Sequence, residues 1–315
     1  MTRLEIKLIT EKESNMLEKI YIQIPAYRDK ELSNTVIDLN KKAKHPERLR
    51  IVIAWQHGNK EQLKKEIFDY GNVEILDIHY KDSKGCNWAR NLLQKQWKNE
   101  AYTLYLDSHH RFVKDWDQET IKMFKVLKEE GVKKPIITAY LPSYDPENEP
   151  DGRMKYPLKI YPLERDKGLL TKLTSYPIPH WKKIKKPLVA QFISLHFLFA
   201  DGFFNEEIHF DPEIYFFGDE VLTSLRAYTY GYDLFHPHII LGWHLYDRKT
   251  RTPHWDDHTS WYKQEEMSYN KMKIIYTTNM TSNAILGLDR KVIEYEKHID
   301  LKLYDNAIEN EAINS

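Results

Sequence analysis

A short apolar segment of the chain ends abruptly in a carboxylate and two imidazoles. Tyr102 to Leu106 has the composition of a buried strand, and Asp107-Ser108-His109-His110 follows it directly. In open α/β sheets, ligands bind beyond the carboxyl ends of the strands. Asp107 and His109 are two residues apart, so their side chains point the same way in an extended segment. Such a pair can hold a divalent cation, although an Asp in a turn followed by a surface His gives the same string.

A second group of acids follows a glycine. Gly218 precedes Asp219 and Glu220 at the start of a segment whose apolar residues have helical spacing. Glycine suits a turn at this place, and the helix dipole favours carboxylates in the first turn. Capping of the helix alone would explain both acids. In a group-transfer enzyme, however, either acid is a candidate for the general base that deprotonates an acceptor.

The elements that must position these residues alternate along the first 110 residues. We expect strands at 20–24, 49–55, 73–80 and 102–106, and helices at 31–42, 60–70 and 88–97. Strands that alternate with helices predict an α/β fold with a mainly parallel central sheet flanked by helices and joined by right-handed crossovers.

The rest of the chain is less regular. We expect a helix at 118–130, a strand at 135–140 and an apolar run at 189–199. One strand-like segment is expected at 234–245, and helices are expected at 260–278 and 290–306. The stretch 141–186 is rich in Pro, Lys and Tyr, and it reads as irregular surface with short strands that could contribute to an acceptor groove.

Composition narrows the class of protein. The 315 residues contain 47 Lys and Arg and 47 Asp and Glu, which gives no reason to expect nucleic acid as a partner. Cys86 is the only cysteine, so an intrachain disulfide is impossible and a reducing compartment fits. Residues 1–17 lack the apolar core of a signal peptide, and no stretch reaches the ~18 apolar residues of a transmembrane segment. We therefore expect a soluble, cytoplasmic protein.

The usual phosphate-binding loops are absent from the sequence. Neither G-x-G-x-x-G nor G-x-x-x-x-G-K-[ST] follows any expected strand. If a nucleotide binds, another device must neutralise its phosphates, and a cation held at Asp107 is the obvious candidate. Arg90 and either Arg248 or Arg251 are further candidates, because cations stabilise charge that develops on a leaving phosphate.

Four strings, in order, carry a resemblance to GT-A sugar-nucleotide transferases. Ile24-Pro25-Ala26-Tyr27-Arg28-Asp29 resembles their first strand exit, and Trp88-Ala89-Arg90-Asn91 resembles the start of a helix common among them. Leu106-Asp107-Ser108-His109 looks like the D-x-H metal motif of polypeptide N-acetylgalactosaminyltransferases. Phe217-Gly218-Asp219-Glu220 matches a glycine-acid segment beneath the transferred sugar.

Over residues 18–300 the chain most resembles the cytoplasmic hydroxyproline N-acetylglucosaminyltransferases, which modify a ubiquitin-ligase adaptor subunit. The shared strings are D-S-H-x-R-F at 107–112, F-G-D-E at 217–220 and W-H at 243–244. The resemblance implies a GT-A fold, a UDP-sugar (most likely UDP-GlcNAc), Mn²⁺ or Mg²⁺, a protein or glycan hydroxyl acceptor and retention of configuration. It also suggests a division into an extension (1–17), a catalytic domain (18–285) and a C-terminal helix and tail (286–315).

The resemblance also implies roles for individual residues. Asp107 and His109 match two metal ligands; the third is expected to be His244, with His254 as the fallback and His236 and His238 as weaker candidates. Asp219, Glu220 and Arg90 match catalytic positions. In a retaining transfer, the leaving phosphate can itself take the acceptor proton, and the two acids then mainly hold the sugar. The nucleotide-sugar is expected to contact Pro25, Ala26, Tyr27, Arg28, Asp29, Trp55, Gln56, Arg90, Asp107, Ser108 and Gly218.

Two other functions use the same residues. A metal-dependent hydrolase of nucleotide sugars or phosphoesters would use the Asp and His cluster to activate water and would need no acceptor. A non-catalytic nucleotide-sugar-binding module could keep the scaffold alone, but it would have no physical need for acids at strand ends.

Overall fold

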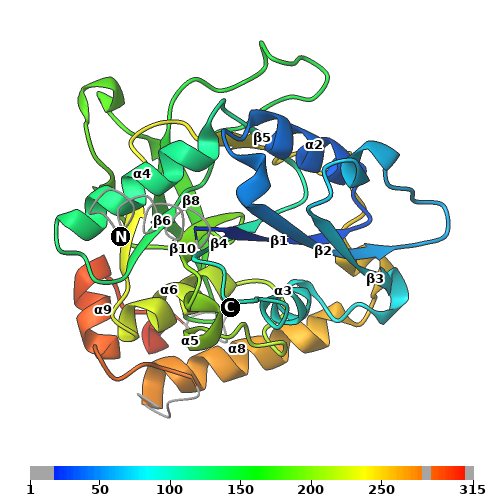
Figure 1. Cartoon of the computed structure of the whole chain (residues 1–315). Helices are drawn as coiled ribbons and strands as arrows, with labels where there is room; N and C mark the ends of the chain where they lie inside the picture. Colours follow the sequence, from blue (N-terminus) through cyan, green and yellow to red (C-terminus); the bar gives the residue numbers. More distant parts are fainter. Residues whose placement is uncertain (1–17, 279–284, 309–315) are drawn as a thin grey trace, which may run out of the picture.

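The computed structural model describes residues 18–278 and 285–308, and at its centre is an eight-stranded sheet (Figure 1). The strands lie in the order β3, β2, β1, β4, β10, β6, β11 and β9. Pairing is parallel from β3 to β4 and between β6 and β11, whereas β10 and β9 run antiparallel to their neighbours. Their bounds are Ile20–Tyr27 (β1), Leu49–His57 (β2), Val73–His79 (β3), Tyr102–Leu106 (β4), Pro135–Thr138 (β6), Leu188–Val189 (β9), Phe197–Asp201 (β10) and Asp233–His236 (β11).

Helices cover both faces of the sheet. One face carries α2 (Leu32–Lys42) and α4 (Trp116–Glu129). The other carries α3 (Cys86–Gln94), α5 (Phe204–Glu207) and α6 (Asp219–Thr229). Since side chains alternate along a strand, both faces must be apolar, which explains the nearly continuous apolar runs. In β1, for example, Ile22 packs in the core beneath α2, whereas Tyr21 packs with Leu93 of α3.

A small second sheet lies beside the end of β4. In it, β12 (Gly242–His244) pairs antiparallel with β5 (His110–Phe112), so that His244 lies opposite His110. At Gly242 the two backbones approach so closely that a Cβ atom would lie 2.5 Å from the carbonyl oxygen of Arg111. The absence of a side chain at this position is what lets β12 reach the end of β4.

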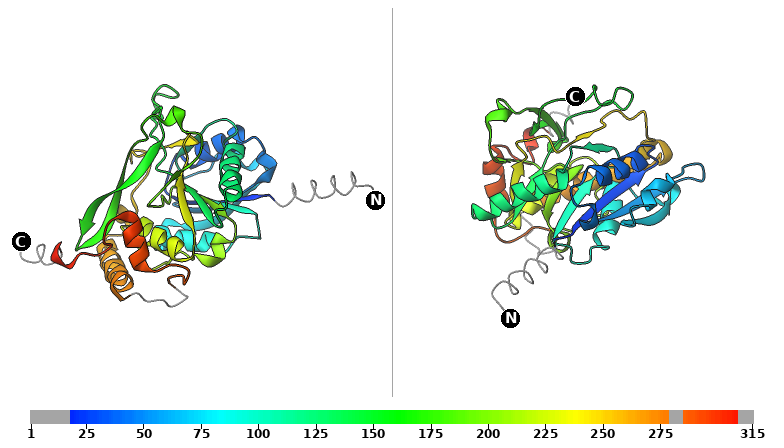
Figure 2. Two further views of the ribbon diagram at one scale, coloured as in Figure 1. Left: turned by 90° about the vertical axis from the view of Figure 1, so that its left-hand side faces the viewer. Right: turned by 45° about the horizontal axis from the view of Figure 1, so that its top comes forward.

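A long hairpin stands beside the central sheet (Figure 2). Its strands are β7 (Leu158–Asp166) and β8 (Leu169–Pro177), and its buried side packs against α6, α8 (Trp261–Thr278) and α9 (Val292–Ile299) in a second apolar core. The turn of the hairpin is held by residues 302–305: Leu170 N donates to the Leu303 carbonyl over 2.9 Å, and Leu169 bridges to Tyr304.

Three expectations about the elements were wrong. Residues 60–70 form only a 3-10 turn (Lys65–Phe68), in which Ile67 is the single buried residue. The stretch 141–186 contains the long hairpin, whose alternation is interrupted by register shifts near Pro162 and Glu164. The segment 234–245 is divided into β11 and β12, in different sheets, because Pro237 has no N–H to continue the ladder.

The expected domain division stays a prediction. Residues 1–17 lie outside the described part of the chain. The C-terminal helix α9 is shorter than the expected 290–306, and its Tyr295 is fully buried in the same core as α6 and α8. Within the described ranges, no helix has both the length and the apolar character that a membrane span requires.

Candidate active site

The carboxyl ends of β1, β2 and β4 meet the N-terminal ends of α3 and α6. This arrangement collects Tyr27, Gln56, Asp107 and Asp219 at one edge of the sheet, although they come from distant parts of the chain. Helix N-termini add partial positive charge at this edge. The edge is therefore suited to an anionic ligand.

One carboxylate and two imidazoles converge there. Asp107, His109 and His244 each offer one ligand atom, and these atoms all lie within 4.8 Å of one another. Asp107 Oδ2 lies 3.8 Å from His109 Nε2 and 3.3 Å from His244 Nε2. The β5–β12 pairing carries His244 to this place, and Leu245 N donates to the His109 carbonyl over 3.1 Å.

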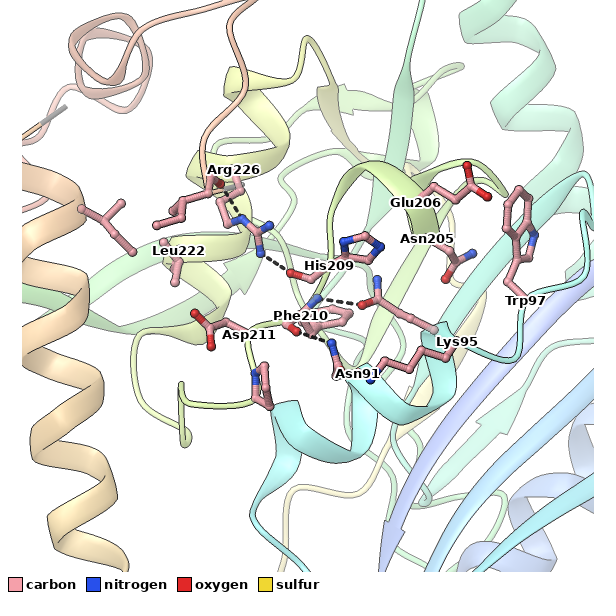
Figure 3. A pocket seen from close by; sticks show the side chains of 14 residues that line it. Asn91, Lys95, Trp97, Asn205, Glu206, His209, Phe210, Asp211, Leu222 and Arg226 are labelled. Atoms are coloured by element: carbon pink, nitrogen blue, oxygen red, sulfur yellow. Dashed lines mark hydrogen bonds between the residues drawn. The ribbon is translucent and has the colours of Figure 1, made fainter. Parts of the chain in front are cut away.

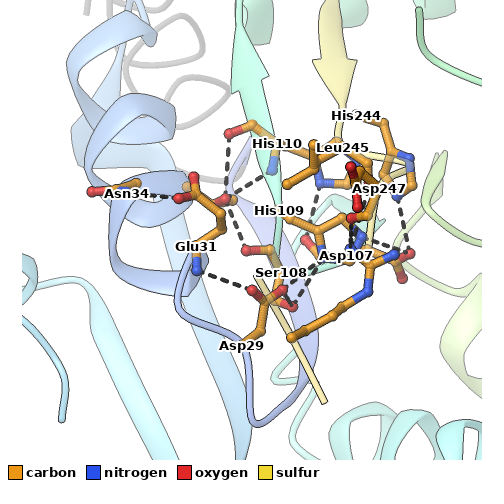
Figure 4. A network of polar contacts seen from close by, with 12 residues as sticks. Asp29, Glu31, Asn34, Asp107, Ser108, His109, His110, His244, Leu245 and Asp247 are labelled. Atoms are coloured by element: carbon orange, nitrogen blue, oxygen red, sulfur yellow. Dashed lines mark hydrogen bonds and ion pairs between the residues drawn. The ribbon is translucent and has the colours of Figure 1, made fainter. Parts of the chain in front are cut away.

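A buried carboxylate orients His109 from behind (Figure 4). Asp29 Oδ2 accepts hydrogen bonds from His109 Nδ1 at 2.7 Å and from the Ser108 hydroxyl at 2.6 Å, and its side chain is 0% exposed. Burial favours the neutral acid, but hydrogen bonding and charge from His109 outweigh it, so the pKa of Asp29 is lowered. When His109 is neutral, an ionised Asp29 holds its proton on Nδ1 and leaves Nε2 with a free lone pair facing Asp107.

The donor set fits a divalent cation. His109 Nε2 is buried and has no hydrogen-bond partner within the described residues. Burial opposes ionisation of Asp107, yet the charges of His109 and Arg90 lower its pKa, so the carboxylate is anionic. One carboxylate oxygen and two imidazole nitrogens form a mixed set that suits Mn²⁺ better than Mg²⁺.

Arg90 connects this cluster to the start of α6. Its Nη1 donates to Asp219 Oδ2 over 2.9 Å, and its Nη2 lies 3.8 Å from Asp107 Oδ1. Asn87, one turn earlier in α3, also donates to Asp219, over 3.3 Å. Gly218 caps α6 with φ 83°, and a Cβ atom there would lie 2.8 Å from Met272 Sδ. The glycine thus allows Asp219 to face Arg90.

Glu220 occupies a different environment from Asp219. Its carboxylate accepts hydrogen bonds from the Tyr140 hydroxyl and, over 2.9 Å, from Leu195 N. Burial, together with the neighbouring Asp219 carboxylate, raises the pKa of Glu220. Burial raises the pKa of Asp219 as well, against the opposing charge of Arg90, so the two acids differ mainly in their hydrogen-bond partners.

Two cavities meet at Asp107. The narrower one, ≈ 170 Å³, lies between the strand exits and the loop that carries α7 (His254–Asp257). Four of the residues expected to contact the nucleotide-sugar line it: Pro25, Tyr27, Gln56 and Ser108. Cys86 also lines it; burial raises the pKa of this thiol to about 12, so it is a neutral wall group rather than a nucleophile.

The wider cavity, ≈ 470 Å³, contains both acids. Arg90, Gly218, Asp219, Glu220 and His244 line one side of it, and residues of β8 line another. Arg248 and Arg251, from the loop after β12, line both cavities. The arrangement is a narrow pocket and a broad pocket that contains both acids, with the Asp107 cluster between them.

Four expected nucleotide-sugar contacts lie elsewhere. Ala26 and Trp55 are neighbours in register on the core face, opposite the face of Pro25, Tyr27 and Gln56, because side chains alternate along strands. Arg28 does not line the cavity; it pairs with Glu61 and Asp257. The side chain of Asp29 is fully buried and orients His109 instead.

The other histidines belong to separate contacts. His254 lies in the narrow cavity between Tyr215 and Ser83, at 2.7 and 3.1 Å, outside the Asp107 cluster. His236 is buried and hydrogen-bonded to the backbone of Thr138 and Ile160. His238 makes no contact with the cluster.

Several residues of the site were not expected from the sequence. Tyr140, His196, Tyr215 and Trp255 line the two cavities. Tyr140, Tyr215 and Trp255 stand in aromatic-rich segments without a distinctive spacing. His196 alone had a signal, because a lone imidazole interrupts the apolar run 192–200.

A further cavity of ≈ 470 Å³ lies behind α3 and α6, away from the acids (Figure 3). Its polar side chains mostly hold the backbone of 208–212: Asn91 and Gln94 donate to the carbonyls of Phe210 and Ile208, and Arg226 donates to that of His209. These groups serve the fold of this segment rather than a ligand.

Helix α8 supports the approach to Gly218. Glu265 Oε1 accepts from Phe217 N over 2.9 Å, and the Ser268 hydroxyl accepts from Tyr215 N over 2.8 Å. Burial raises the pKa of Glu265 to about 7, because the backbone hydrogen bond only partly offsets desolvation. Its second oxygen has no partner within the described residues.

Comparisons with known proteins identify the family and the fold. The family model described as glycosyltransferase (GlcNAc) matches residues 19–66 and 59–310. No curated protein sequence matches the chain. The crystal structure of GalNAc-T7 with UDP, GalNAc and Mn²⁺ is similar, with a TM-score of 0.56 at 15% identity over 91% of this chain and 56% of that chain.

A second similar structure is residues 1–349 of TarS from S. aureus in complex with UDP-GlcNAc. Its TM-score is 0.51 at 14% identity, over 89% of this chain and 70% of that chain. The expected GT-A fold is thereby confirmed. The chain spans little more than half the length of the GalNAc-T7 chain that it matches.

Glu265 predicts a pH-dependent stability. Between pH 4.5 and about 7 the unfolded chain ionises this group while the folded chain keeps it protonated, so stability falls as the pH rises and stays reduced above that range. The side chain of Glu265→Gln cannot ionise. The free energy of unfolding of this variant, minus that of wild type, should therefore increase by roughly 2–4 kcal/mol from pH 5 to pH 8. Urea denaturation at both pH values measures this. The control is the exposed neighbour Glu266. The free energies of unfolding of Glu266→Gln and wild type should differ by the same amount at pH 5 and at pH 8.

Asp29→Asn is expected to weaken cation binding without touching a ligand. Loss of the charge behind Nδ1 removes the orientation of His109, and such outer partners typically contribute about 10–100-fold in affinity. Titration calorimetry with MnCl₂ measures the loss. Asp77→Asn is a matched control, because Asp77 pairs with His57 at the surface over 3.0 Å. Equal Mn²⁺ affinity for Asp29→Asn and wild type would contradict this role for Asp29.

Proposed function

Since the chain belongs to the glycosyltransferase (GlcNAc) family, we propose that it transfers N-acetylglucosamine from UDP-GlcNAc to a hydroxyl acceptor, with the help of Mn²⁺. The observation that carries the proposal is the convergence of Asp107, His109 and His244 between two cavities, one of which contains Asp219 and Glu220. Two solved structures of similar fold were crystallised with UDP, GalNAc and Mn²⁺ and with UDP-GlcNAc.

The narrow cavity suits the nucleotide. Tyr27 and Trp255 offer rings to a base, Gln56 offers an amide, and Arg248 and Arg251 offer charge to a diphosphate. Asp107, His109 and His244 would hold Mn²⁺, which when bound supplies positive charge beside the leaving diphosphate. Arg251 donates to the backbone carbonyls of Leu245 and Asp247, so its guanidinium is fixed before a ligand arrives.

The acids suit the transferred sugar. Asp219 is held by Arg90 and Asn87, and Glu220 is held by Tyr140 and Leu195 N, so both carboxylates have defined positions. Positioned groups of this kind orient sugar hydroxyls at low entropic cost. Because both acids are already engaged, we assign them to holding the sugar, and we propose that the leaving diphosphate accepts the proton and that configuration is retained.

The acceptor is proposed to enter the wide cavity. Its wall along β8 carries Lys172, Thr174 and Ser175, which can hydrogen-bond to a peptide or a glycan. The acceptor class stays a protein or glycan hydroxyl. Cytoplasmic location also stays a prediction.

Removal of the proposed ligands tests the reaction. Asp107→Ala and His244→Ala should each lower Mn²⁺-dependent turnover of UDP-GlcNAc by about 100-fold or more, because each removes a direct ligand of the cation. Release of UDP, with and without candidate acceptors, measures turnover, and intact-mass analysis of the acceptor detects the added sugar.

His254→Ala separates the two candidate third ligands. It should weaken UDP binding but leave Mn²⁺ affinity within about twofold of wild type, because His254 lies outside the cluster. Loss of Mn²⁺ affinity in His254→Ala but not in His244→Ala would reverse the assignment. Fast UDP release that no acceptor accelerates would favour the hydrolase instead. Product NMR reports whether the anomeric configuration is retained.

A further inference from the structure

A buried histidine in the wide cavity has no role in the reaction as described so far. His196 immediately precedes β10, is 7% exposed and lines the cavity that contains Asp219 and Glu220. Its neighbour Leu195 donates its backbone N–H to Glu220, so the backbone at His196 is tied to the start of α6. The imidazole therefore has a defined position beside the proposed sugar site.

The backbone determines which nitrogen of His196 carries the proton. Leu141 N donates to His196 Nε2 over 3.0 Å, so Nε2 must be the unprotonated nitrogen. In a neutral imidazole, the proton then lies on Nδ1, which becomes a hydrogen-bond donor.

Nδ1 opens into the cavity. It has no partner within the described residues, and it is also not among the sealed side-chain atoms that lack one. His196 lines the wide cavity, and we therefore assign the exposure of Nδ1 to that cavity. The site thus contains an unused N–H donor on a side chain that is otherwise more than nine-tenths buried.

Three rings prevent His196 from turning. It is stacked on His244 with 4.1 Å between ring centroids and on Tyr140 with 5.2 Å, and Tyr246 meets it edge-on at 5.9 Å. A rotation would break these contacts and leave Leu141 N–H unpaired in the interior, at a cost typical of a buried unsatisfied donor. The direction of the Nδ1–H bond is therefore built into the fold.

The chemistry of the cavity indicates what this donor meets. The neighbouring carboxylates of Asp219 and Glu220 accept hydrogen bonds, so they suit sugar hydroxyls, which can donate. An amide carbonyl can only accept, and it needs a donor such as Nδ1–H. We propose that His196 is a specificity-determining residue that donates Nδ1–H to the carbonyl oxygen of the 2-acetamido group of the transferred sugar.

This inference rests on the proposed function and deepens it, because it explains how an N-acetylated sugar would be distinguished from plain glucose. A sugar without the acetamido group would leave Nδ1–H without this acceptor. Sites that are built to hydrogen-bond a substrate group reject analogues that lack it.

Two isosteric substitutions separate the functions of the two nitrogens. Gln places its terminal amide near Nε2 and can still accept from Leu141 N, but it has no group at Nδ1. Asn places its amide near Nδ1 and can still donate into the cavity. The measurement is kcat/KM for UDP-GlcNAc and for UDP-glucose, together with UDP affinity in the presence of Mn²⁺.

His196→Gln is expected to lower the ratio of kcat/KM for UDP-GlcNAc over UDP-glucose by about tenfold or more, the effect of one buried hydrogen bond. His196→Asn should keep this ratio within about threefold of wild type. UDP affinity should stay within about twofold in both variants, which shows that the nucleotide site and the cation site are intact.

An unchanged ratio in His196→Gln, or an equal loss of the ratio in both variants, would overturn the inference. Loss of UDP affinity together with the ratio would also overturn it, because His196 would then act through His244. Absence of turnover of any UDP-sugar by wild type is a different result, and it contradicts the proposed function itself.

Discussion

The hydrogen bond between His109 and the buried carboxylate of Asp29 is the interaction on which the site depends. It joins the exit of β1 to the exit of β4, and it sets the tautomer that frees His109 Nε2. Burying a carboxylate is costly unless its oxygens are paired, and Asp29 is paired with His109, Ser108 and the backbone N–H of Glu31. Because the buried Asp29 carboxylate must keep these partners, the position of His109 Nε2 is fixed.

The same strand exit also holds the loop that follows β12. Asp29 forms a backbone bridge with Arg251, Lys30 N donates to the Thr250 carbonyl, and Arg28 and Tyr27 both contact Asp257. One short segment therefore orients a ligand of the cluster, places the loop arginines and borders the narrow cavity. A local change at 27–30 would reach every part of the site.

Much of this arrangement could be predicted from the sequence, since strand ends and acids are local features. The exit after Leu106 lies where its apolar run stops, whereas β1 and β2 continue past the expected ends at 24 and 55 to Tyr27 and His57. Asp107 and His109 follow β4 directly, and Asp219 and Glu220 open α6. The expected contacts of Ala26 and Trp55 did not take into account that side chains alternate between the two faces of a strand. A contiguous motif does not say which of its residues face the ligand.

What the sequence could not supply came from contacts between distant segments. His244 reaches Asp107 only because Pro237 divides an apolar run and Gly242 allows a close antiparallel pair. The role of Asp29 depends on its partner 80 residues away, and the long hairpin depends on burial against α6 and α8. These are properties of tertiary packing, which no local pattern encodes.

The pairing of residues 302–305 with the hairpin turn has a consequence for how the protein is made. The strands that carry Tyr27, Gln56 and Asp107 come from the first third of the chain, whereas the segment that secures the turn of β7 and β8 comes near its end. During translation, β1, β2 and β4 emerge early, but the turn of the hairpin cannot be held until residue 305 has emerged. Premature termination after α8 would therefore leave a polypeptide that contains Asp107, His109 and His244 but lacks the segment that holds the hairpin turn.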